Sequence, residues 1–242
     1  MRDIFNGFAL AISMLTTVPF FKIHNFYKGI NGYTVMFYPL VGFILGSVLW
    51  TLHSLLSPFI APAHLAVIIF ALWVLLTGAL HLDGFSDTVD GLYVSKERAL
   101  EVMKDPHIGG MGMIISATFL ILKASSLTVF EAFYLLPLVL LLSRLNATLA
   151  IYFYPYISQN GMGALAKEEF TKTQMLIALF YSFLALFLYN KLLLLVSALL
   201  VLFVIKSFFI KRYGGFSGDI YGFLIEVTEL VLLNVILFGL SV

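Results

Sequence analysis

Residues 65–91, LAVIIFALWVLLTGALHLDGFSDTVDG, join one of the most hydrophobic runs of the chain directly to three aspartates. The rest of the chain also avoids charge, because 61% of its 242 residues are hydrophobic and 11% are charged, with a mean hydropathy of +1.03. Soluble domains are about 45–50% apolar and about 25% charged. No water-soluble core would hide this much apolar surface, so the composition predicts an all-α, polytopic integral membrane protein.

Apolar runs near twenty residues predict about seven transmembrane helices in a single membrane-embedded catalytic domain, residues 1–242. A shorter apolar segment at 4–19 is either a further span or an interfacial or re-entrant helix. Without cysteine, the chain has no disulfide framework, thiolate nucleophile or cysteine metal site. The predicted spans cover 34–56, 62–81, 110–129, 132–154, 173–189, 191–210 and 220–241.

The basic residues divide unevenly between the two ends of these spans. When 4–19 is counted as a span, one end carries only Lys191 and Arg2. Cytoplasmic loops of membrane proteins are enriched in Lys and Arg, so the long connections 82–109, 155–172 and 206–219 are predicted to face the cytoplasm. The other end carries ten basic residues: Lys22, Lys28, Lys96, Arg98, Lys104, Lys167, Lys172, Lys206, Lys211 and Arg212.

The three aspartates that follow the apolar run, Asp83, Asp87 and Asp90, lie at i, i+4 and i+7, which puts them on one helical face. Like charges at this spacing repel each other, especially near lipid. Hard carboxylate oxygens favour Mg²⁺ or Mn²⁺, and Mg²⁺ usually also binds substrate phosphates. Gly84 and Gly91 leave space for a substrate or a neighbouring helix. The alternative is a solvated acidic loop that ends the span.

The segment RALEVMKDPHIGGMG, residues 98–112, leads into the next span through several glycines. Glycines before a helix N-terminus can present backbone N–H groups to an anion. The alternative is that these glycines form only a flexible connection after an amphipathic surface helix. His107 by itself is interpreted as a polar loop residue.

Charged and polar residues also lie inside the later spans, where they face a partner or a wet cavity because lipid solvates them poorly. Two interpretations stay open for Arg144: a structural ion pair, or a cavity open to the cytoplasm with arginine for phosphate and acids for metal or hydroxyls. Lys123 is predicted to snorkel. The other members of this group are Asn146, Asp219, Glu226 and Glu229.

In this order, the motifs resemble the adenosylcobinamide-GDP ribazoletransferase (cobalamin or cobamide synthase) family. The matching pieces are FYPLVGFILG at 37–46, LLTGALHLDGFSDTVDGLY at 75–93, RALEVMKDPHIGGMG at 98–112, SRLNATLAIYFYPY at 143–156 and GGFSGDIYGFLIEVTELVLL at 214–233. The resemblance implies a multi-pass inner-membrane enzyme that joins adenosylcobinamide-GDP to α-ribazole or α-ribazole 5′-phosphate with release of GMP. It also implies dependence on Mg²⁺ and chemistry akin to that of CDP-alcohol phosphotransferases.

Carried over residue by residue, the family's acidic motif falls on Asp83, Asp87 and Asp90. We expect the first two to hold Mg²⁺ and Asp90 to be a third ligand or the base for the attacking ribose hydroxyl. The K-D-x-x-x-G motif falls on Lys104, Asp105 and Gly109, and G-G-x-[ST]-G-D on Gly214, Gly215, Ser217, Gly218 and Asp219. Where the family commonly has Ser-Arg, this chain has Pro106-His107, so one phosphate-binding charge is missing unless His107 is protonated or Arg98 substitutes.

The remaining expected roles concern substrate binding. Arg98, Lys104 and Arg144 would neutralise phosphates, and Asp219, Glu226 and Glu229 would complete a second metal site or a nucleoside site. The set is completed by His81, Asp105, Gly109, Asn146 and Ser217. The expected partners are the corrinoid-GDP and ribazole substrates and membrane lipid, with no nucleic acid, and self-association into a homo-oligomer is left open.

Two rival functions are weighed. A lipid-forming CDP-alcohol phosphotransferase shares the D-x-x-D-G start, which Asp87–Gly91 matches, but its Ala-Arg is replaced by Val94-Ser95. A cation-coupled transporter would need polar groups that reach the midplane from both sides and often shows repeats. Neither feature is present here. The accepted base, the choice of nucleoside or nucleotide, and the number of metal ions are not fixed by the sequence.

Overall fold

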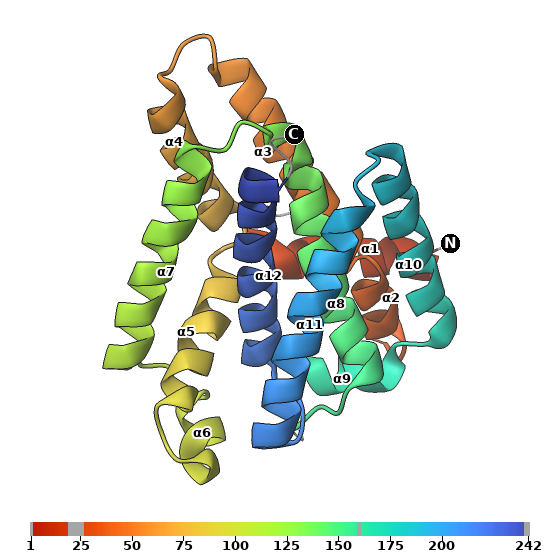
Figure 1. The fold of residues 1–242 in the computed structure, drawn as a ribbon. Helices are drawn as coiled ribbons and strands as arrows, with labels where there is room; N and C mark the ends of the chain where they lie inside the picture. The colour runs from red at the N-terminus through yellow and green to blue at the C-terminus, as the bar shows by residue number, and fades with distance from the viewer. Residues whose placement is uncertain (1, 19–26, 159–160, 240–242) are drawn as a thin grey trace.

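The computed structural model describes residues 2–18, 27–158 and 161–239, and these ranges fold into helices (Figure 1). Within them no strand forms, and a single parallel bridge joins Tyr156 to Phe216. The helices are α1 Arg2–Leu15, α2 Ile30–Met36, α3 Tyr38–Leu56, α4 Pro62–Leu76, α5 Leu80–Leu92, α6 Lys96–Val102, α7 Gly110–Thr128, η1 Phe133–Leu135, α8 Leu136–Phe153, α9 Met162–Glu169, α10 Lys172–Leu188, α11 Leu192–Tyr213 and α12 Gly218–Gly239.

Five of these helices are long and apolar enough to cross a membrane: α3, α7, α8 with η1, α11 and α12. Two bent pairs, α4 with α5 and α9 with α10, raise the number to seven when each pair counts as one span. The predicted all-α, polytopic membrane fold is therefore confirmed.

The predicted span 62–81 extends beyond the end of the helix that the structure shows. Helix α4 stops at Leu76, and the chain then bends by 83° into α5. Gly78 and Ala79 both have positive φ, 60° and 55°, which ends one helix and redirects the next. The acidic segment is therefore a helix rather than a loop, and the prediction that its three aspartates belong to one helix is confirmed.

Helix α1 occupies most of the shorter apolar segment at 4–19. Its 14 residues would reach only about 21 Å at 1.5 Å per residue, whereas the hydrocarbon core is about 30 Å thick. Figure 1 shows it lying across the other helices, where Gly7 packs against Tyr33 of α2. This geometry favours the interfacial or re-entrant alternative, so the placement of Arg2 at the sparsely charged end, which assumed a full span, loses its support.

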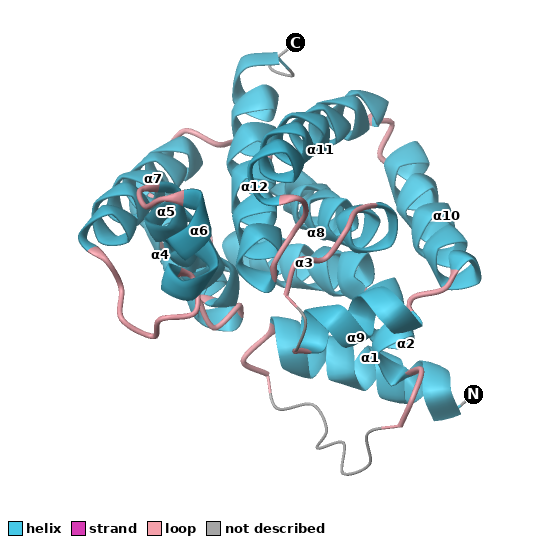
Figure 2. Ribbon diagram, turned by 90° about the horizontal axis from the view of Figure 1, so that it is seen from below, coloured by secondary structure: helices cyan, strands magenta, loops and turns pink. Residues whose placement is uncertain are grey.

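Helix α8 lies at the centre of the bundle, packed against α3, α10, α11 and α12 (Figure 2). Every residue from Leu136 to Ile151 is buried. The outer helices α10 and α11 instead expose large apolar side chains such as Phe180, Phe187 and Phe203. Lipid is the natural surrounding for such a surface.

The described parts of the three connections predicted to be long lie at one end of the bundle, the lower end in Figure 1. The predicted connection 206–219 is only the turn 214–217, because α11 continues to Tyr213 and α12 begins at Gly218. The lower end holds α6, α9 and the turn from α11 to α12, whereas the short turns from α3 to α4, from α7 to η1 and from α10 to α11 lie at the other end. The basic residues of these connections therefore lie at the same end of the bundle, as the order of the predicted spans implied.

Helix α3 contacts α8 through glycines spaced one turn apart. A Cβ added to Gly42 would lie 2.2 Å from the carbonyl oxygen of Leu140, and one added to Gly46 would lie 2.5 Å from that of Leu136. Small residues at this spacing let two helix backbones approach closely, which is how many membrane helices associate.

We expect Gly42→Ala to lower the free energy of unfolding by about 1–3 kcal/mol, because the new methyl group would force α3 away from α8. The measurement is denaturant unfolding of the purified protein in mild detergent. Gly239→Ala is the matched control, since a Cβ there meets open space. Equal stability of the two variants would contradict the close contact.

Candidate active site

Two glycines bring α5 and α12 together at the end of the bundle that holds the long connections. A Cβ added to Gly84 would lie 3.0 Å from the Cα of Asp219, and one added to Gly222 would lie 3.3 Å from the Cα of Gly84. Of the two uses predicted for the space at Gly84, the structure shows a neighbouring helix. Because the backbones approach so closely, Asp83 of α5 and Asp219 of α12 border the same cavity.

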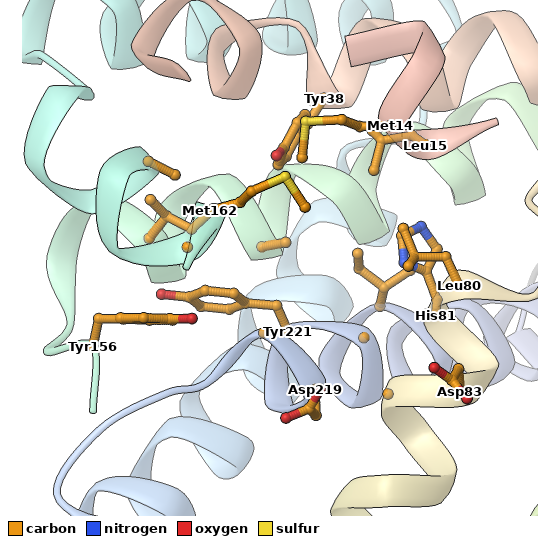
Figure 3. Close-up of a pocket in the computed structure, with 18 residues that line it drawn as sticks. Met14, Leu15, Tyr38, Leu80, His81, Asp83, Tyr156, Met162, Asp219 and Tyr221 are labelled. Carbon is orange, nitrogen blue, oxygen red and sulfur yellow. The ribbon is translucent and has the colours of Figure 1, made fainter. Parts of the chain in front are cut away.

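This cavity has a volume of about 290 Å³ and lies between α1, α3, α5, α8, α9 and α12. Asp83 and Asp219 lie on one side, and His81 borders it from α5 (Figure 3). The other large lining side chains are aromatic rings and thioethers: Met14, Tyr38, Tyr156, Met162 and Tyr221.

Asp87 lies one turn beyond Asp83 and is half-buried. Its carboxyl is within electrostatic range of Asp83, Asp219 and Asp90. Within the described ranges, no Lys, Arg or His forms an ion pair with any of these four carboxyl groups. The site therefore concentrates like charges, which a bound cation would offset.

The donor set at this site suits a hard cation. In the part of the chain that the structure describes, no three His, Asp or Glu side chains are grouped closely enough to hold a metal by themselves. Mg²⁺ is commonly bound by one or two carboxylates together with substrate phosphates and water. One or two of the carboxylates of Asp83, Asp87 and Asp219 would fit that mode, in which the substrate completes the coordination.

Asp90 has a different position from the other two aspartates of α5. Its Oδ2 accepts the backbone N–H of Gly109 at 2.8 Å, and its Oδ1 accepts that of Gly112 at 2.7 Å. The glycines at the start of α7 thus present N–H groups to an anion, which is one of the two alternatives for this segment, and that anion is a side chain of the protein itself. Any Cβ at Gly109 or Gly112 would collide with the carboxylate. The roles of Asp90 as ligand or base stay predictions.

The chain before Asp219 is held by the 154–157 segment. The N–H of Phe216 donates to the carbonyl of Pro155, and the N–H of Ile157 donates to the carbonyl of Phe216, both at 2.9 Å. A Cβ at Gly215 would lie 2.3 Å from the Pro155 carbonyl oxygen. The G-G-x-S-G-D segment is therefore a turn that fixes the start of α12 beside Tyr156.

Ser217 positions the first acidic residue of α12. Its hydroxyl accepts the N–H of Ile220 at 3.3 Å, as a helix cap does, and lies 3.2 Å from Oδ2 of Asp219. The predicted binding residue Ser217 thus contacts Asp219 and is itself buried.

The basic residues predicted to neutralise phosphates lie outside the cavity. Arg98 on α6 and Lys104 after it are exposed, and Lys104 is within electrostatic range of Asp219. Asp105 accepts the backbone N–H of His107 at 3.0 Å and pairs with its Nδ1 at 2.7 Å. These hydrogen bonds, the backbone one first, lower the pKa of the exposed Asp105 carboxyl.

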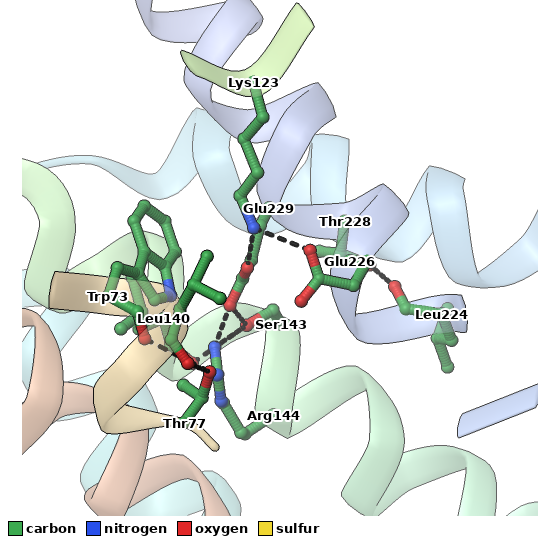
Figure 4. A network of polar contacts seen from close by, with 11 residues as sticks. Trp73, Thr77, Lys123, Leu140, Ser143, Arg144, Leu224, Glu226, Thr228 and Glu229 are labelled. Carbon is green, nitrogen blue, oxygen red and sulfur yellow. Dashed lines mark hydrogen bonds and ion pairs between the residues drawn. The ribbon is translucent and has the colours of Figure 1, made fainter. Parts of the chain in front are cut away.

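A buried ion network lies deeper between α7, α8 and α12 (Figure 4). Lys123 pairs with Glu226 at 2.7 Å and with Glu229, and Arg144 pairs with Glu229. Lys123 also lies 4.3 Å from the ring centroid of Trp73. The prediction that Lys123 snorkels is wrong, because its side chain is only 3% exposed and its charge is paired inside the bundle.

For Arg144, the structure shows the ion-pair alternative. Arg144, Glu226 and Glu229 are buried and none of them lines the cavity, although Arg144 lies within electrostatic range of His81, which does. Asn146 donates to the carbonyl of Ala198 at 2.8 Å, so it joins α8 to α11. The predicted substrate contacts of these residues stay predictions.

The sequence analysis missed the aromatic and methionine walls of the cavity. A tyrosine or methionine carries no signal in a chain with 24 phenylalanines and 12 tyrosines, because the same residues are needed to face lipid and fill the core. Only the convergence of α1, α9 and α12 distinguishes Met14, Met162 and Tyr221 from the rest.

Fold and site define a polytopic membrane protein with an acidic, aromatic-walled cavity at one end of its helical bundle. The model of the cobalamin-5-phosphate synthase family matches residues 7–237, so the chain belongs to that family. It is therefore an enzyme, a transferase of cobalamin nucleotide-loop assembly, which confirms the family resemblance of the motifs.

Curated relatives are named adenosylcobinamide-GDP ribazoletransferase. The one from Thermosynechococcus vestitus is 38% identical over 81% of this chain and 82% of its own length. Those from Desulforamulus reducens and Desulfitobacterium hafniense are 37% and 34% identical, over 97% and 93% of both chains respectively. No solved structure matches the chain.

We expect Lys123→Met to lower the free energy of unfolding by about 3–5 kcal/mol, because it leaves the buried Glu226 without a cation and Glu229 with Arg144 alone. Lys28→Met is the matched control, since Lys28 pairs with Glu168 at 3.6 Å on the exposed surface and such pairs contribute about 0–1 kcal/mol. Both are measured by denaturant unfolding in mild detergent. Similar losses would show that the network does not stabilise the bundle.

Proposed function

We propose that this protein condenses adenosylcobinamide-GDP with α-ribazole, or with its 5′-phosphate, to give adenosylcobalamin, or its 5′-phosphate, and GMP. The observation that carries the proposal is the position of Asp83 and Asp219 at one side of the cavity, in a chain whose relatives bear the name of this transferase. Carboxylates from two helices suit a reaction between a pyrophosphate and a hydroxyl group.

The identity of the products defines the bonds that change. Because GMP leaves, the pyrophosphate P–O bond breaks on the corrinoid side, and the corrinoid phosphorus forms a new bond to a ribose hydroxyl oxygen of the acceptor. The hydroxyl proton passes to a base, and GMP carries away the electron pair of the broken bond. The enzyme therefore has to hold two substrates in line and neutralise phosphate charge.

Asp83, Asp87 and Asp219 are the residues that would hold Mg²⁺, which when bound supplies positive charge to the phosphate oxygens. Their support is the all-oxygen donor set and the lack of an ion-pair partner in the described ranges. Lys104 and Arg98 are proposed to contact the pyrophosphate from α6 and the connection after it, which provide cations that the cavity lining lacks. The main role proposed for Asp90 is to position the N-terminus of α7. It would serve as a metal ligand or a base only through the lone pairs that its two hydrogen bonds leave free.

We also propose that the protein lies in the inner membrane and that its site faces the cytoplasm. The long connections and the cavity carboxylates share one end of the bundle, and the basic residues of those connections favour the cytoplasmic side. Water-soluble nucleotide substrates would then reach Asp83 and Asp219 without crossing lipid.

We expect Asp83→Asn and Asp219→Asn each to reduce GMP release by about 100-fold or more, because each removes a charge that acts on the phosphate centre. Membranes that contain the protein are given adenosylcobinamide-GDP, α-ribazole and Mg²⁺, and GMP and the new corrinoid are separated by chromatography. Glu131→Gln, an exposed change at the far end of the bundle, serves as the control.

Absence of the corrinoid product from well-folded wild-type protein would overturn the proposal. The same membranes would then be given a CDP-alcohol and a lipid acceptor. Undiminished turnover in both aspartate variants would instead support the proposed reaction but show that these two carboxylates are not needed for it.

Metal removal should stop turnover, and Mg²⁺ or Mn²⁺ should restore it, because carboxylate oxygens prefer such hard cations. The direct measurement is Mn²⁺ binding by electron paramagnetic resonance, with adenosylcobinamide-GDP present. Binding should weaken by about 10-fold or more in Asp83→Asn and stay unchanged in Glu131→Gln. Full activity after exhaustive chelation would exclude a metal requirement.

A further inference from the structure

We infer that the cavity between α1, α9 and α12 binds the benzimidazole base and ribose of the α-ribazole acceptor, while the corrinoid-GDP binds outside it, beside the carboxylates. This inference rests on the proposed function and assigns one substrate to one part of the site. It follows from the lining, the charge, the size and the unpaired polar atoms of the cavity.

The walls of the cavity suit a flat aromatic ring. The rings of Tyr156 and Tyr221 stack at a centroid distance of 6.1 Å and an interplanar angle of 17°, and form one wall. Met14 and Met162 extend toward each other from α1 and α9 across that wall (Figure 3). Thioethers and tyrosine rings both pack favourably on aromatic faces.

The described lining away from the carboxylates offers no basic side chain that would bind a phosphate. Among the described residues that line the cavity there is no Lys or Arg, and the two carboxylates are those of Asp83 and Asp219. A pyrophosphate placed there would face like charge without a cation of the protein. Lys104, which is within electrostatic range of Asp219, lies outside the lining. The phosphates therefore belong at the edge of the cavity and an uncharged group belongs inside.

The volume of about 290 Å³ is close to the lower end of ligand sites, about 300–1,000 Å³. It suits a bicyclic base with its ribose, whereas a corrin macrocycle with its side chains is far too large. Of the uncharged groups in this reaction, the interior thus has room for a nucleoside only.

The unpaired polar atoms favour a benzimidazole over a guanine. Nε2 of His81 and the hydroxyl of Tyr221 are buried and have no hydrogen-bond partner in the described ranges, and both residues line the cavity. Buried polar atoms are costly when unpaired, so a ligand should satisfy them. A benzimidazole nucleoside offers one ring nitrogen and its ribose hydroxyls. Guanine presents O6 and N7 as acceptors beside its N1–H and amino donors, and among the described lining residues no Asn, Gln, Lys or Arg donates to such acceptors.

The orientation that results is consistent with the proposed chemistry. With the base against Tyr156, Tyr221 and Met162, the ribose extends toward Asp83 and Asp219, and a ribose hydroxyl reaches the side where the phosphate lies. The aromatic wall therefore positions the attacking group, and the carboxylates act on the group being attacked.

The test uses two tryptophan substitutions on the same surface helix. Met162 lines the cavity and is 63% exposed, whereas Leu165 is 47% exposed, one turn along α9, and does not line it. We expect Met162→Trp to raise the KM for α-ribazole by about tenfold or more, since it fills space that the substrate needs. The KM for adenosylcobinamide-GDP should change by less than about twofold in the same variant, and Leu165→Trp should change neither KM.

Tyr221→Phe provides a second arm, because it removes only the unpaired hydroxyl. We expect it to raise the KM for α-ribazole by roughly three- to tenfold and to leave that for adenosylcobinamide-GDP unchanged. Equilibrium binding of radiolabelled α-ribazole to the full-length protein in chelator gives a readout without turnover. Free benzimidazole should displace it and GMP should not.

The outcomes separate the two proposals. Selective loss of corrinoid-GDP affinity in Met162→Trp would mean that guanosine occupies the cavity, and this would overturn the inference. Equal KM values in Met162→Trp and Leu165→Trp would overturn it as well. In both cases, wild-type release of GMP would leave the proposed function standing. If the wild-type protein bound α-ribazole but showed no turnover, the proposed reaction would be rejected. The assignment of α-ribazole to the cavity would still stand.

Discussion

Lipid solvates neither charges nor free backbone groups, and in the described part of this protein four charged side chains are buried together between α7, α8 and α12. Lys123, Arg144, Glu226 and Glu229 carry two positive and two negative charges, and they meet as one network between α7, α8 and α12. The pairing makes the group neutral as a whole, so α8 can be buried along nearly its full length. Breaking one pair would leave a charge in a place that water does not reach.

Close approach of helices is the second requirement, and glycines meet it at both contacts that matter. Gly42 and Gly46 bring α3 against α8, and Gly84 and Gly222 bring α5 against α12. The second contact depends on the bend after Leu76, which turns the acidic segment back toward the start of α12. Without that bend, Asp83 would continue the direction of α4 and would not share a cavity with Asp219.

Three kinds of side chain surround the site: acidic, basic and apolar. The carboxylates of Asp83, Asp87 and Asp219 gather negative charge, and the exposed Lys104 and Arg98 provide positive charge outside the cavity. The aromatic and thioether walls offer an apolar surface. Under the proposed function, such a separation would let an apolar ring and a pyrophosphate approach the same point from different surroundings.

The sequence by itself determined the membrane fold, because the apolar runs are long enough to span and the basic residues collect in alternate connections. It also determined the helical face of Asp83, Asp87 and Asp90 and, through its motifs, the enzyme family. Only the tertiary structure decided which of these aspartates accepts the N–H groups at the start of α7, that Lys123 is paired rather than exposed to the membrane surface, and that Tyr156, Met162 and Tyr221 form a cavity wall. The physical reason is that periodicity and hydropathy report on neighbours along one helix. Partners such as Asp90 with Gly112, or Lys123 with Glu226, are separated by many residues and meet only through helix packing.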